Sequence, residues 1–427
     1  MSKKLITLSA CLIAATTLVF GQQKDSLQNK IEPVNNLEEV IVTANKIEQK
    51  QNATGKVLTI VNAAQLQANA GRTLSQVLNE QAGLYLPGSL SNAGTVPSIF
   101  MRGASSGRTL ILIDGIPVGD PSMISNEFDL NLVPIEQVER IEILKGAQST
   151  MYGSDAIGGV INIITKAKAK KIWTGSFATG SYGTRNLDIQ HANTFRKISY
   201  TIGIENKTAT GFSSAIDKNN TGTFDKDGYQ NKSVFANINY SLNKHWNLKA
   251  FTKRTSYKAD VDYGAYKDDK DNHFNNATNM TGVSVQYKKD KNNFQLQYQY
   301  NTQDRLYRND SVDKKYELFS DNHYWGKSHF ADAFYSTTIS KNIQWIFGSD
   351  FRYGSFNQTY ASLGAWGPYN FDFKDTFQFQ TAAYTSLIIN STSNKWLLEV
   401  GGRYNNHSRY GNNQTFTISP SYKLNDQ

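Results

Sequence analysis

The second part of the chain alternates apolar and polar positions with a period of two. In one such segment Phe294, Leu296 and Tyr298 are separated by Gln295 and Gln297. This is the spacing of side chains on one face of a β-strand. Twelve segments of this kind lie between residues 172 and 427. We therefore predict a run of antiparallel strands over this region.

The connections between these segments alternate in length. Short turns such as Arg196-Lys197 and Lys244-His245 separate longer polar stretches, which lie near residues 206–229, 258–276, 304–322 and 354–375. Tyr and Trp also recur near the strand ends. A soluble β-sandwich does not predict short turns on one side and long loops on the other. A transmembrane antiparallel β-barrel does, so we predict a mainly β chain with that barrel over residues 172–427.

Residues 46–166 show a different pattern, in which short helices alternate with short apolar strands. One helix is predicted from Asn62 to Ala70, and a second begins at Thr73, where Gln76 completes a capping box. The strand 110–113 runs into Asp114-Gly115, a dipeptide that type I′ hairpin turns favour. This segment is predicted to be a compact α+β domain.

The N-terminus has the order of a secretory signal. Lys3 and Lys4 precede an apolar run from Leu5 to Phe20, and small and polar residues follow from Gly21. We predict a signal peptide over residues 1–21, followed by a flexible linker over residues 22–36. The mature chain is thus expected to be exported.

Composition and missing motifs exclude several classes of function. The net charge of +9 is spread along the chain, which argues against a nucleic-acid partner. The single Cys11 excludes disulfides and cysteine-based zinc or catalytic sites. The glycine-rich segment 153–159 lacks the lysine of a P-loop, and the six histidines lack metal-ligand spacing. We predict no catalytic residue, no enzyme activity and no cofactor required for chemistry.

Aspartates gather in two of the predicted long loops. Asp217, Asp225 and Asp227 belong to the 206–229 loop, and the 258–276 loop contributes Asp260, Asp262, Asp268, Asp269 and Asp271. Carboxylates from adjacent loops suit Ca²⁺, which takes six to eight oxygen ligands. The alternative is a solvated acidic surface balanced by neighbouring lysines.

A β-prone hexad, Glu39–Ala44, follows the flexible linker. It reads Glu39, Val40, Ile41, Val42, Thr43, Ala44. It is either a strand of the small domain or an edge offered to the sheet of a partner protein, since an extended peptide can add itself to a sheet through backbone hydrogen bonds.

Together these pieces resemble the TonB-dependent outer-membrane receptors. The resemblance rests on the hexad and on three stretches of the small domain, namely Ser98–Gly103 followed by Leu110–Pro117, Val138–Glu142, and Tyr152–Thr165. It is dense over residues 46–166 and thinner over the strands. It implies that residues 46–166 are a plug domain inside the barrel lumen and that residues 37–45 are the Ton box region.

The resemblance also implies a location and a set of partners. The hexad would bind TonB, which works with ExbB and ExbD, in the outer membrane of a Gram-negative bacterium. Outer-membrane lipids, the barrel-assembly machinery and a periplasmic binding protein downstream complete the expected partners. The implied function is active import of a scarce, large nutrient.

The plug run from Ser98 to Thr165 is most similar to receptors that import cobalamin, which makes cobalamin the favoured substrate. The alternative is a ferric siderophore or haem; a passive porin or structural barrel is a further hypothesis. The apical plug loops imply substrate contacts at Ser91, Asn92, Thr95, Val96, Ser122 and Met123. The resemblance implies calcium ligands at Asp217, Asp225, Asp227 and Asp262, with one of Asp268, Asp269 or Asp271 as a further ligand, for which we select Asp269.

The number of predicted strands differs from that of the family the chain resembles. Family barrels have 22 strands, whereas about twelve are predicted here. Because barrel diameter grows with strand number, a closed twelve-strand lumen would be too small for a plug of this length. An open sheet would leave backbone groups unsatisfied in lipid. We therefore expect the sequence to be the N-terminal portion of a longer receptor.

A proline placed in the hexad tests its assignment. Val42→Pro removes a backbone N–H that strand pairing with a partner needs. We expect transport to be abolished while ligand binding is unchanged, as measured by uptake and equilibrium binding of the same labelled ligand. Transport equal to that of the unmodified chain would contradict the assignment.

Overall fold

The computed structural model describes residues 41–42, 45–51, 54–166, 171–310, 319–364, 367–393 and 395–424. The predicted signal peptide (1–21) and linker (22–36) lie outside these residues, as do Glu39, Val40, Thr43 and Ala44 of the hexad. The chain forms two units, residues 1–41 and residues 42–427, and the second holds both the run of strands and the small domain. Among the described helices, none has the length and apolar character to cross a membrane.

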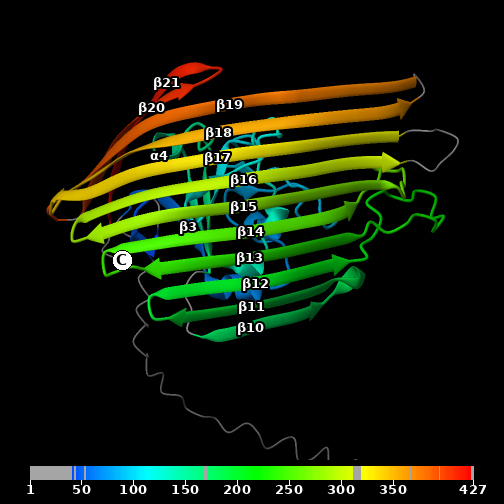
Figure 1. Cartoon of the computed structure of the whole chain (residues 1–427), viewed down its shortest axis with the longest axis horizontal. Helices are drawn as coiled ribbons and strands as arrows, with labels where there is room; N and C mark the ends of the chain where they lie inside the picture. The colour runs from blue at the N-terminus through cyan, green and yellow to red at the C-terminus, as the bar shows by residue number, and fades with distance from the viewer. Residues whose placement is uncertain are drawn as a thin grey trace, which may run out of the picture. The chain divides into compact units, whose positions relative to one another are not determined.

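The largest element is a sheet of twelve antiparallel strands arranged in chain order (Figure 1). The prediction of a run of antiparallel strands is therefore confirmed. The strands are β10 (Ile172–Thr179), β11 (Arg185–Phe195), β12 (Ile198–Ala209), β13 (Tyr229–Ser241), β14 (Trp246–Asp260), β15 (Asn272–Lys289), β16 (Asn292–Asp310), β17 (Phe319–Ser340), β18 (Ile343–Gly364), β19 (Gly367–Asn390), β20 (Trp396–His407) and β21 (Gly411–Tyr422).

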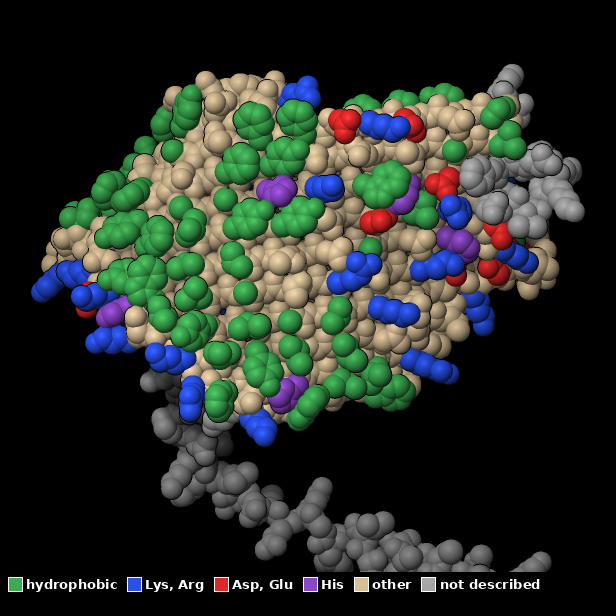
Figure 2. Space-filling view, viewed as in Figure 1, with side chains coloured by type: hydrophobic (Ala, Val, Ile, Leu, Met, Phe, Trp, Pro, Cys, Tyr) green, Lys and Arg blue, Asp and Glu red, His purple; other side chains and the backbone are tan. Residues whose placement is uncertain are grey.

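The two faces of this sheet have inverted polarity. On β11 the polar residues Asn186, Asp188 and Gln190 are buried against the plug, whereas Leu187 and Ile189 are exposed on the outside. Figure 2 shows that, on the side of the outer face turned toward the viewer, apolar side chains gather in a broad area. A sheet with a polar inner face and an apolar outer face is the pattern of a membrane barrel rather than a soluble sandwich.

The height of the apolar area matches a bilayer. On the outer face of β14, Trp246, Leu248, Ala250 and Thr252 precede the first charged residue, Arg254. These eight residues of strand extend roughly 27 Å, which at a tilt of about 40° is near 20 Å in height. That is close to the ~25 Å apolar band of outer-membrane barrels.

Two of the predicted long loops are wrong. β18 and β19 continue to Gly364 and from Gly367, so most of residues 354–375 is paired strand. β16 and β17 similarly extend into residues 304–322. The physical reason is that backbone pairing continues above the apolar band, where exposed strands can carry polar side chains. Long connections do follow β12 and β14, at residues 210–228 and 261–271.

The plug has a five-stranded sheet in the order β3-β8-β9-β6-β7. Its strands are β3 (Val57–Val61), β8 (Val138–Lys145), β9 (Gly159–Thr165), β6 (Thr109–Ile113) and β7 (Ile116–Val118). Asp114 and Gly115 both have positive φ, 51° and 82°, which confirms the predicted type I′ turn between β6 and β7.

Two capped helices cover this sheet. α2 (Ala63–Ala68) begins after Asn62 and α3 (Leu74–Asn79) after Thr73, and each has a complete capping box. The smaller elements are β1 (Ile41–Val42), β2 (Gln49–Lys50), β4 (Leu84–Tyr85), β5 (Phe100–Met101), α4 (Ser149–Tyr152) and the 3₁₀ turns η2 (Leu130–Leu132), η3 (Ile135–Gln137) and η4 (Ser181–Gly183).

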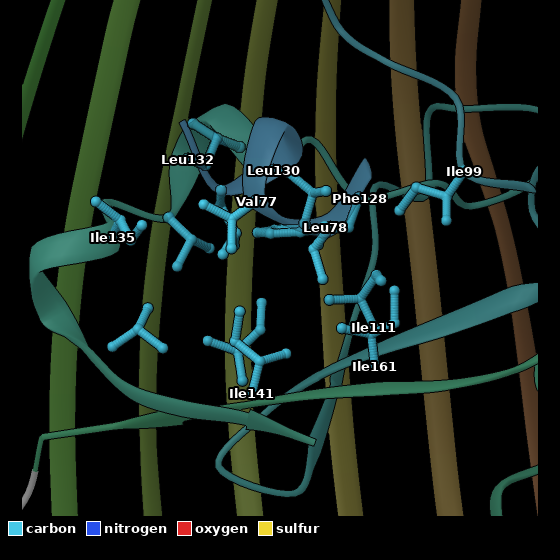
Figure 3. Close-up of a cluster of buried hydrophobic side chains, with 14 of the residues drawn as sticks. Val77, Leu78, Ile99, Ile111, Phe128, Leu130, Leu132, Ile135, Ile141 and Ile161 are labelled. Carbon is cyan, nitrogen blue, oxygen red and sulfur yellow. The ribbon is translucent and has the colours of Figure 1, made fainter. Parts of the chain in front are cut away.

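The plug core lies between its helices and its sheet (Figure 3). Leu78 from α3 and Leu132 from η2 face Ile141 and Ile161 from the sheet, and all four are fully buried. Burying aliphatic side chains of this size gives each roughly 1.5–3 kcal/mol. The plug therefore holds its apical loops on a packed base.

Candidate functional site

The plug presents two loops, residues 88–96 and 119–126, toward the long-loop ends of the strands. A Cβ on Gly94 would meet Ala259 of β14 at 2.4 Å, so glycine allows this close approach. Pro121 packs in the same way against Gly326 and Gly354 of β17 and β18. We call this end of the plug, with the sheet around it, the apex.

Asn92 ties the first apical loop to the connection 210–228. Its buried Nδ2 donates to the Phe212 carbonyl and to Asp227 Oδ2, both at 2.8 Å. The predicted substrate residue Asn92 thus has its amide nitrogen engaged by an outer loop. A ligand that displaced Asn92 would therefore also displace the connection 210–228.

The other predicted substrate residues occupy varied positions. Ser91 is exposed, the Thr95 carbonyl accepts a hydrogen bond from Asn131, and Val96 packs against the plug core. Ser122 donates to Asp120 Oδ1 at 2.5 Å, and Met123 is half-buried. Their contact with substrate stays a prediction.

The apical loops also expose two large aliphatic residues that the sequence analysis did not single out. Leu90 is 75% exposed and Ile124 fully so. Apolar side chains left in water at the tip of a packed domain are candidates for ligand contact. Their only sequence signal is their place in the two apical loops.

A buried ion pair fixes the second apical loop to the sheet. Arg305 of β16 donates from Nη1 to Asp120 Oδ2 at 2.8 Å, and both side chains are almost fully enclosed. The guanidinium carbon also lies 4.6 Å from the ring centre of Tyr324. The pair neutralises an inward-facing arginine beside this loop.

Aromatic rings form a continuous chain across five strands at the level of the apex. Ring centres in the series Tyr229, Tyr257, Phe274, Tyr307 and Tyr324 are separated by 5.7, 5.5, 4.4 and 6.4 Å. Tyr257 donates its hydroxyl proton to Asp129 of the plug. Burial raises the pKa of the Asp129 carboxyl, which these hydrogen bonds partly oppose.

The aromatic surface continues on β18 and β19 above the plug. Gly326 pairs with Phe356 and contacts Pro121, so this face of β18 is the inner one. Phe356 stacks on Phe373 at 5.4 Å. We call this inner surface the vestibule wall, and Arg305, paired with Asp120, borders it beside the rings of Tyr307 and Tyr324. The residues of the vestibule wall are Tyr307, Asn322, Tyr324, Phe356, Gln358, Tyr360, Tyr369, Phe371 and Phe373.

Three carboxylates from the outer connections converge. Asp225, Asp262 and Asp268 each offer an oxygen within 4.8 Å of the others. Asp225 Oδ1 is buried and has no hydrogen-bond partner among the described residues. Burial, with the nearby Asp268, Asp227 and Asp262 carboxylates, raises the pKa of Asp225 to about 6. We call these three residues the acidic group.

Backbone donors hold the acidic group in place. Asp262 Oδ2 accepts from the Ala215 N–H at 2.6 Å, and its Oδ1 accepts from the Asp269 N–H at 2.9 Å. Asp227 Oδ2 accepts from the Ser214 N–H at 2.6 Å, while its Oδ1 is also buried without a partner among the described residues. Burial raises the pKa of Asp227.

Of the five predicted calcium ligands, Asp225 and Asp262 belong to this group, whereas Asp217, Asp227 and Asp269 do not. Asp217 accepts from the Gly222 N–H at 2.9 Å and closes a turn of its own loop. Asp269 Oδ2 accepts from Asn309 at 2.7 Å. Asp268, which the sequence left as one of several choices, takes a place in the group. The role of all five residues in metal binding stays a prediction.

The opposite end of the plug is also tied to the sheet. Lys46, close after the hexad, donates to Asp332 Oδ1 at 2.9 Å and to the Tyr384 hydroxyl at 2.8 Å. Burial lowers the pKa of Lys46, against the attraction of Asp332. Nearby, a cavity of about 450 Å³ opens between plug and sheet, beside the Asp114–Lys249 ion pair of 2.6 Å. Of the hexad, only Ile41 and Val42 are described, as β1.

These features define a class of protein. A strand sheet with an apolar outer face, enclosing a separately folded α+β plug, is the architecture of a plugged outer-membrane receptor. Residues 49–160 match the TonB-dependent Receptor Plug Domain family. Residues 49–160 thus form a plug domain of the kind found in TonB-dependent receptors, which confirms the resemblance found in the sequence.

Among curated proteins, the chain is similar to the vitamin B12 transporter BtuB of Vibrio cholerae. The identity is 27% over 410 residues, which cover 91% of this chain and 60% of the transporter. The chain thus spans about three-fifths of the length of the curated relatives it matches.

Solved structures share the fold. The ferric yersiniabactin uptake receptor FyuA of Yersinia pestis has a TM-score of 0.68 at 19% identity, covering 87% of this chain and 63% of that one. The ferripyoverdine receptor of Pseudomonas aeruginosa has a TM-score of 0.71 at 13% identity, covering 91% and 57%.

Two arginines on β16 allow the contribution of a buried ion pair to be compared with that of an exposed one. Arg305→Ala leaves the Asp120 carboxylate buried without its partner, so we expect a loss of about 3–5 kcal/mol in plug–sheet stability. Arg308→Ala breaks an exposed pair with Asp321 on the outer face of the same strand and should cost under about 1 kcal/mol. Denaturant-dependent proteolysis of the 119–126 loop measures both. Equal losses in the two variants would contradict the assigned role of Arg305.

Proposed function

We propose that the chain carries the plug and substrate-binding apex of a receptor that imports cobalamin across the outer membrane, driven by TonB. The observation that carries the choice of substrate is the vestibule wall, which consists of aromatic rings and amides and whose neighbouring cation, Arg305, is paired with Asp120. Such a surface favours a large ligand that is neutral or nearly so, with apolar faces and amide groups. Cobalamin has this chemistry.

The similarity to the vitamin B12 transporter BtuB supports the same substrate. A ferric siderophore or haem is the alternative, since the solved structures with this fold include ferric yersiniabactin and ferripyoverdine receptors. A polyanionic chelate would be held best by unpaired cations, whereas Arg305 is already paired with Asp120. This favours cobalamin over anionic chelates.

The proposed mechanism begins at the apex. Substrate binds between the vestibule wall and the exposed Leu90 and Ile124, and closes the outer connections through Asn92 and Asp227. The hexad then becomes available to TonB, which pairs with it as an added strand. Lys46 lies just after the hexad and is held by Asp332. A force applied to the hexad would therefore act first on this ion pair. Force supplied through ExbB and ExbD remodels the plug.

We also propose that Ca²⁺ binds the acidic group. Three converging carboxylates, with orphaned oxygens on Asp225 and Asp227, provide the oxygen-rich and negatively charged surroundings that Ca²⁺ prefers. Asp225 comes from the connection 210–228, and Asp262 and Asp268 come from 261–271. A bound ion would therefore crosslink the two connections above the apex, where they shape the entrance.

Substrate choice is tested by equilibrium binding of cyanocobalamin, haemin and a ferric catecholate siderophore to the purified protein. We expect cyanocobalamin to bind most tightly, and Phe373→Ala to weaken it roughly tenfold by removing a stacked ring. Trp345→Ala, on the outer face, is the matched control and should leave binding unchanged. Tighter binding of the siderophore or haemin would overturn the proposal.

Calcium binding should depend on pH through Asp225. Because its folded pKa of about 6 lies above the ordinary value, its proton stabilises the metal-free loops at low pH, and this contribution is lost as pH rises through 6. Calcium affinity should rise over the same interval, since the ion needs the carboxylate.

Isothermal titration with Ca²⁺ between pH 5 and 7.5 measures this dependence. Asp225→Asn should lower the affinity at least about tenfold and flatten the pH profile. Asp217→Asn, outside the acidic group, should change neither quantity. The proposal fails if Asp217→Asn has the larger effect, or if the unmodified protein binds no calcium at pH 7.5.

A further inference from the structure

A buried carboxylate lies where the first apical loop, the body of the plug and the sheet meet. Asp129 precedes the turn η2, and its side chain is only 7% exposed. Tyr257 of β14 donates its hydroxyl proton to Asp129 Oδ2, and Asn276 Nδ2 of β15 donates to the same oxygen at 2.8 Å. The other carboxylate oxygen accepts from the backbone N–H of Asn131 at 2.9 Å. We call Asp129, Tyr257, Asn276 and Asn131 the Asp129 network.

Asp129 differs from two other plug carboxylates at the border with the sheet in having no cation. Asp120 is paired with Arg305 and Asp114 with Lys249, whereas Asp129 forms no ion pair among the described residues. A buried carboxylate is costly unless its oxygens are satisfied, and here three hydrogen-bond donors satisfy them. Hydrogen bonds are directional, so this carboxylate fixes the orientation of its donors as well as their distance.

The Asp129 network holds the base of the first apical loop. Asn131 Nδ2 donates to the Thr95 carbonyl at 2.9 Å, and the Tyr257 hydroxyl lies 3.5 Å from the Gly94 carbonyl. Asn231 of β13 donates to the Asn131 carbonyl at 2.9 Å, which ties η2 to the sheet as well. The carboxylate thus reaches two backbone carbonyls at the base of the loop, each through one intervening side chain.

The same network holds the aromatic chain that runs toward the vestibule wall. The ring centre of Tyr257 lies 5.7 Å from that of Tyr229 and 5.5 Å from that of Phe274. Phe274 in turn stacks at 4.4 Å on Tyr307, which belongs to the vestibule wall. Because the Tyr257 hydroxyl is bound to Asp129, the ring in the middle of this packing has a fixed orientation.

We infer that Asp129 is a positioning residue for substrate, which fixes the first apical loop relative to the vestibule wall before substrate binds. Substrate is proposed to bind between Leu90 on that loop and the vestibule wall, so one buried carboxylate holds both sides of the site. A site whose two sides are already in place loses less conformational freedom on binding. The inference rests on the proposed function and adds to it the group that orders the site.

Removing the acceptor tests the inference. Asp129→Asn keeps the size of the side chain, yet an amide offers one acceptor oxygen where the carboxylate offers two. At least one of the three donors is left without an acceptor, so we expect the affinity for cyanocobalamin to fall at least about tenfold. Hydrogen exchange of the backbone amides in residues 88–96 should become faster in the ligand-free protein.

A second variant removes the donor instead. Tyr257→Phe keeps the ring in the aromatic chain and deletes the hydroxyl, so it should weaken cyanocobalamin binding in the same direction. The double variant should bind within about twofold of Asp129→Asn alone, because both changes remove the same interaction.

Uptake kinetics separate positioning from a general loosening of the plug. Asp129→Asn should raise the KM for cyanocobalamin uptake and leave the maximal rate unchanged, since the network orders the free site and takes no part in the pull on the hexad. A variant that only loosened the plug would change the maximal rate.

Thr278→Val is the matched control. Thr278 is fully buried on the inner face of β15, but its hydroxyl donates to Asn301 Oδ1 of β16 at 2.8 Å and so bonds within the sheet. This variant should leave cyanocobalamin affinity and hydrogen exchange in residues 88–96 unchanged.

Three results would overturn the inference. They are binding within about twofold of the unmodified protein by both Asp129→Asn and Tyr257→Phe, an equal loss in Thr278→Val, or a lower maximal uptake rate at constant KM. If Asp129→Asn does not fold, Tyr257→Phe decides by the same measurements. Absence of cyanocobalamin binding to the unmodified protein would overturn the proposed function instead, whereas hydrogen exchange in residues 88–96 needs no ligand and still tests the hold of Asp129 on the loop.

Discussion

Hydrocarbon offers no hydrogen-bond partner to a peptide group, and the rest of this structure depends on that constraint. The strands from β11 to β20 satisfy it by pairing on both sides with their chain neighbours through long, nearly unbroken registers, while β10 and β21 at the two ends of the described sheet each pair on one side. Once the outer face must be apolar, the alternation along each strand turns the polar residues inward. The inner face is thus polar before any ligand is considered, and a domain that fills it must offer polar partners.

The plug meets that requirement with a few charged contacts and many amides. Arg305 with Asp120, Lys46 with Asp332 and Lys249 with Asp114 join plug and sheet at widely separated heights. Apolar packing also crosses this interface, because Phe334 and Leu397 of the sheet belong to the same buried cluster as Leu112 of the plug. Tyr257 and Met280 of the sheet likewise join the main core of the plug. Remodelling of the plug during the transport that we propose would therefore have to separate apolar as well as polar contacts.

Direct contacts link the apex to the two outer connections, residues 210–228 and 261–271. Asn92 joins the first apical loop to Asp227, and Asp225 lies in the same connection, close to Asp262 and Asp268 of the next one. A ligand that moves the apical loop and an ion that draws the carboxylates together would act on the same segment. The raised pKa of Asp225 comes from burial and from the neighbouring carboxylates, which are the surroundings in which we propose that calcium binds. Substrate and calcium binding are therefore expected to be coupled.

Local spacing in the sequence was enough to predict the strands, the capping boxes after Asn62 and Thr73 and the Asp114-Gly115 turn, because each depends on neighbouring residues. The wrong loops at 304–322 and 354–375 arose because a high content of polar residues was taken to mark a loop, although Tyr369, Phe371 and Phe373 still alternate with polar residues along β19. The aromatic chain from Tyr229 to Tyr324, the Arg305–Asp120 pair and the approach of Asp268, instead of the selected Asp269, to Asp225 join residues far apart in the chain. Only the register of the strands and the docking of the plug decide which of these side chains meet, so the tertiary structure alone determined the site.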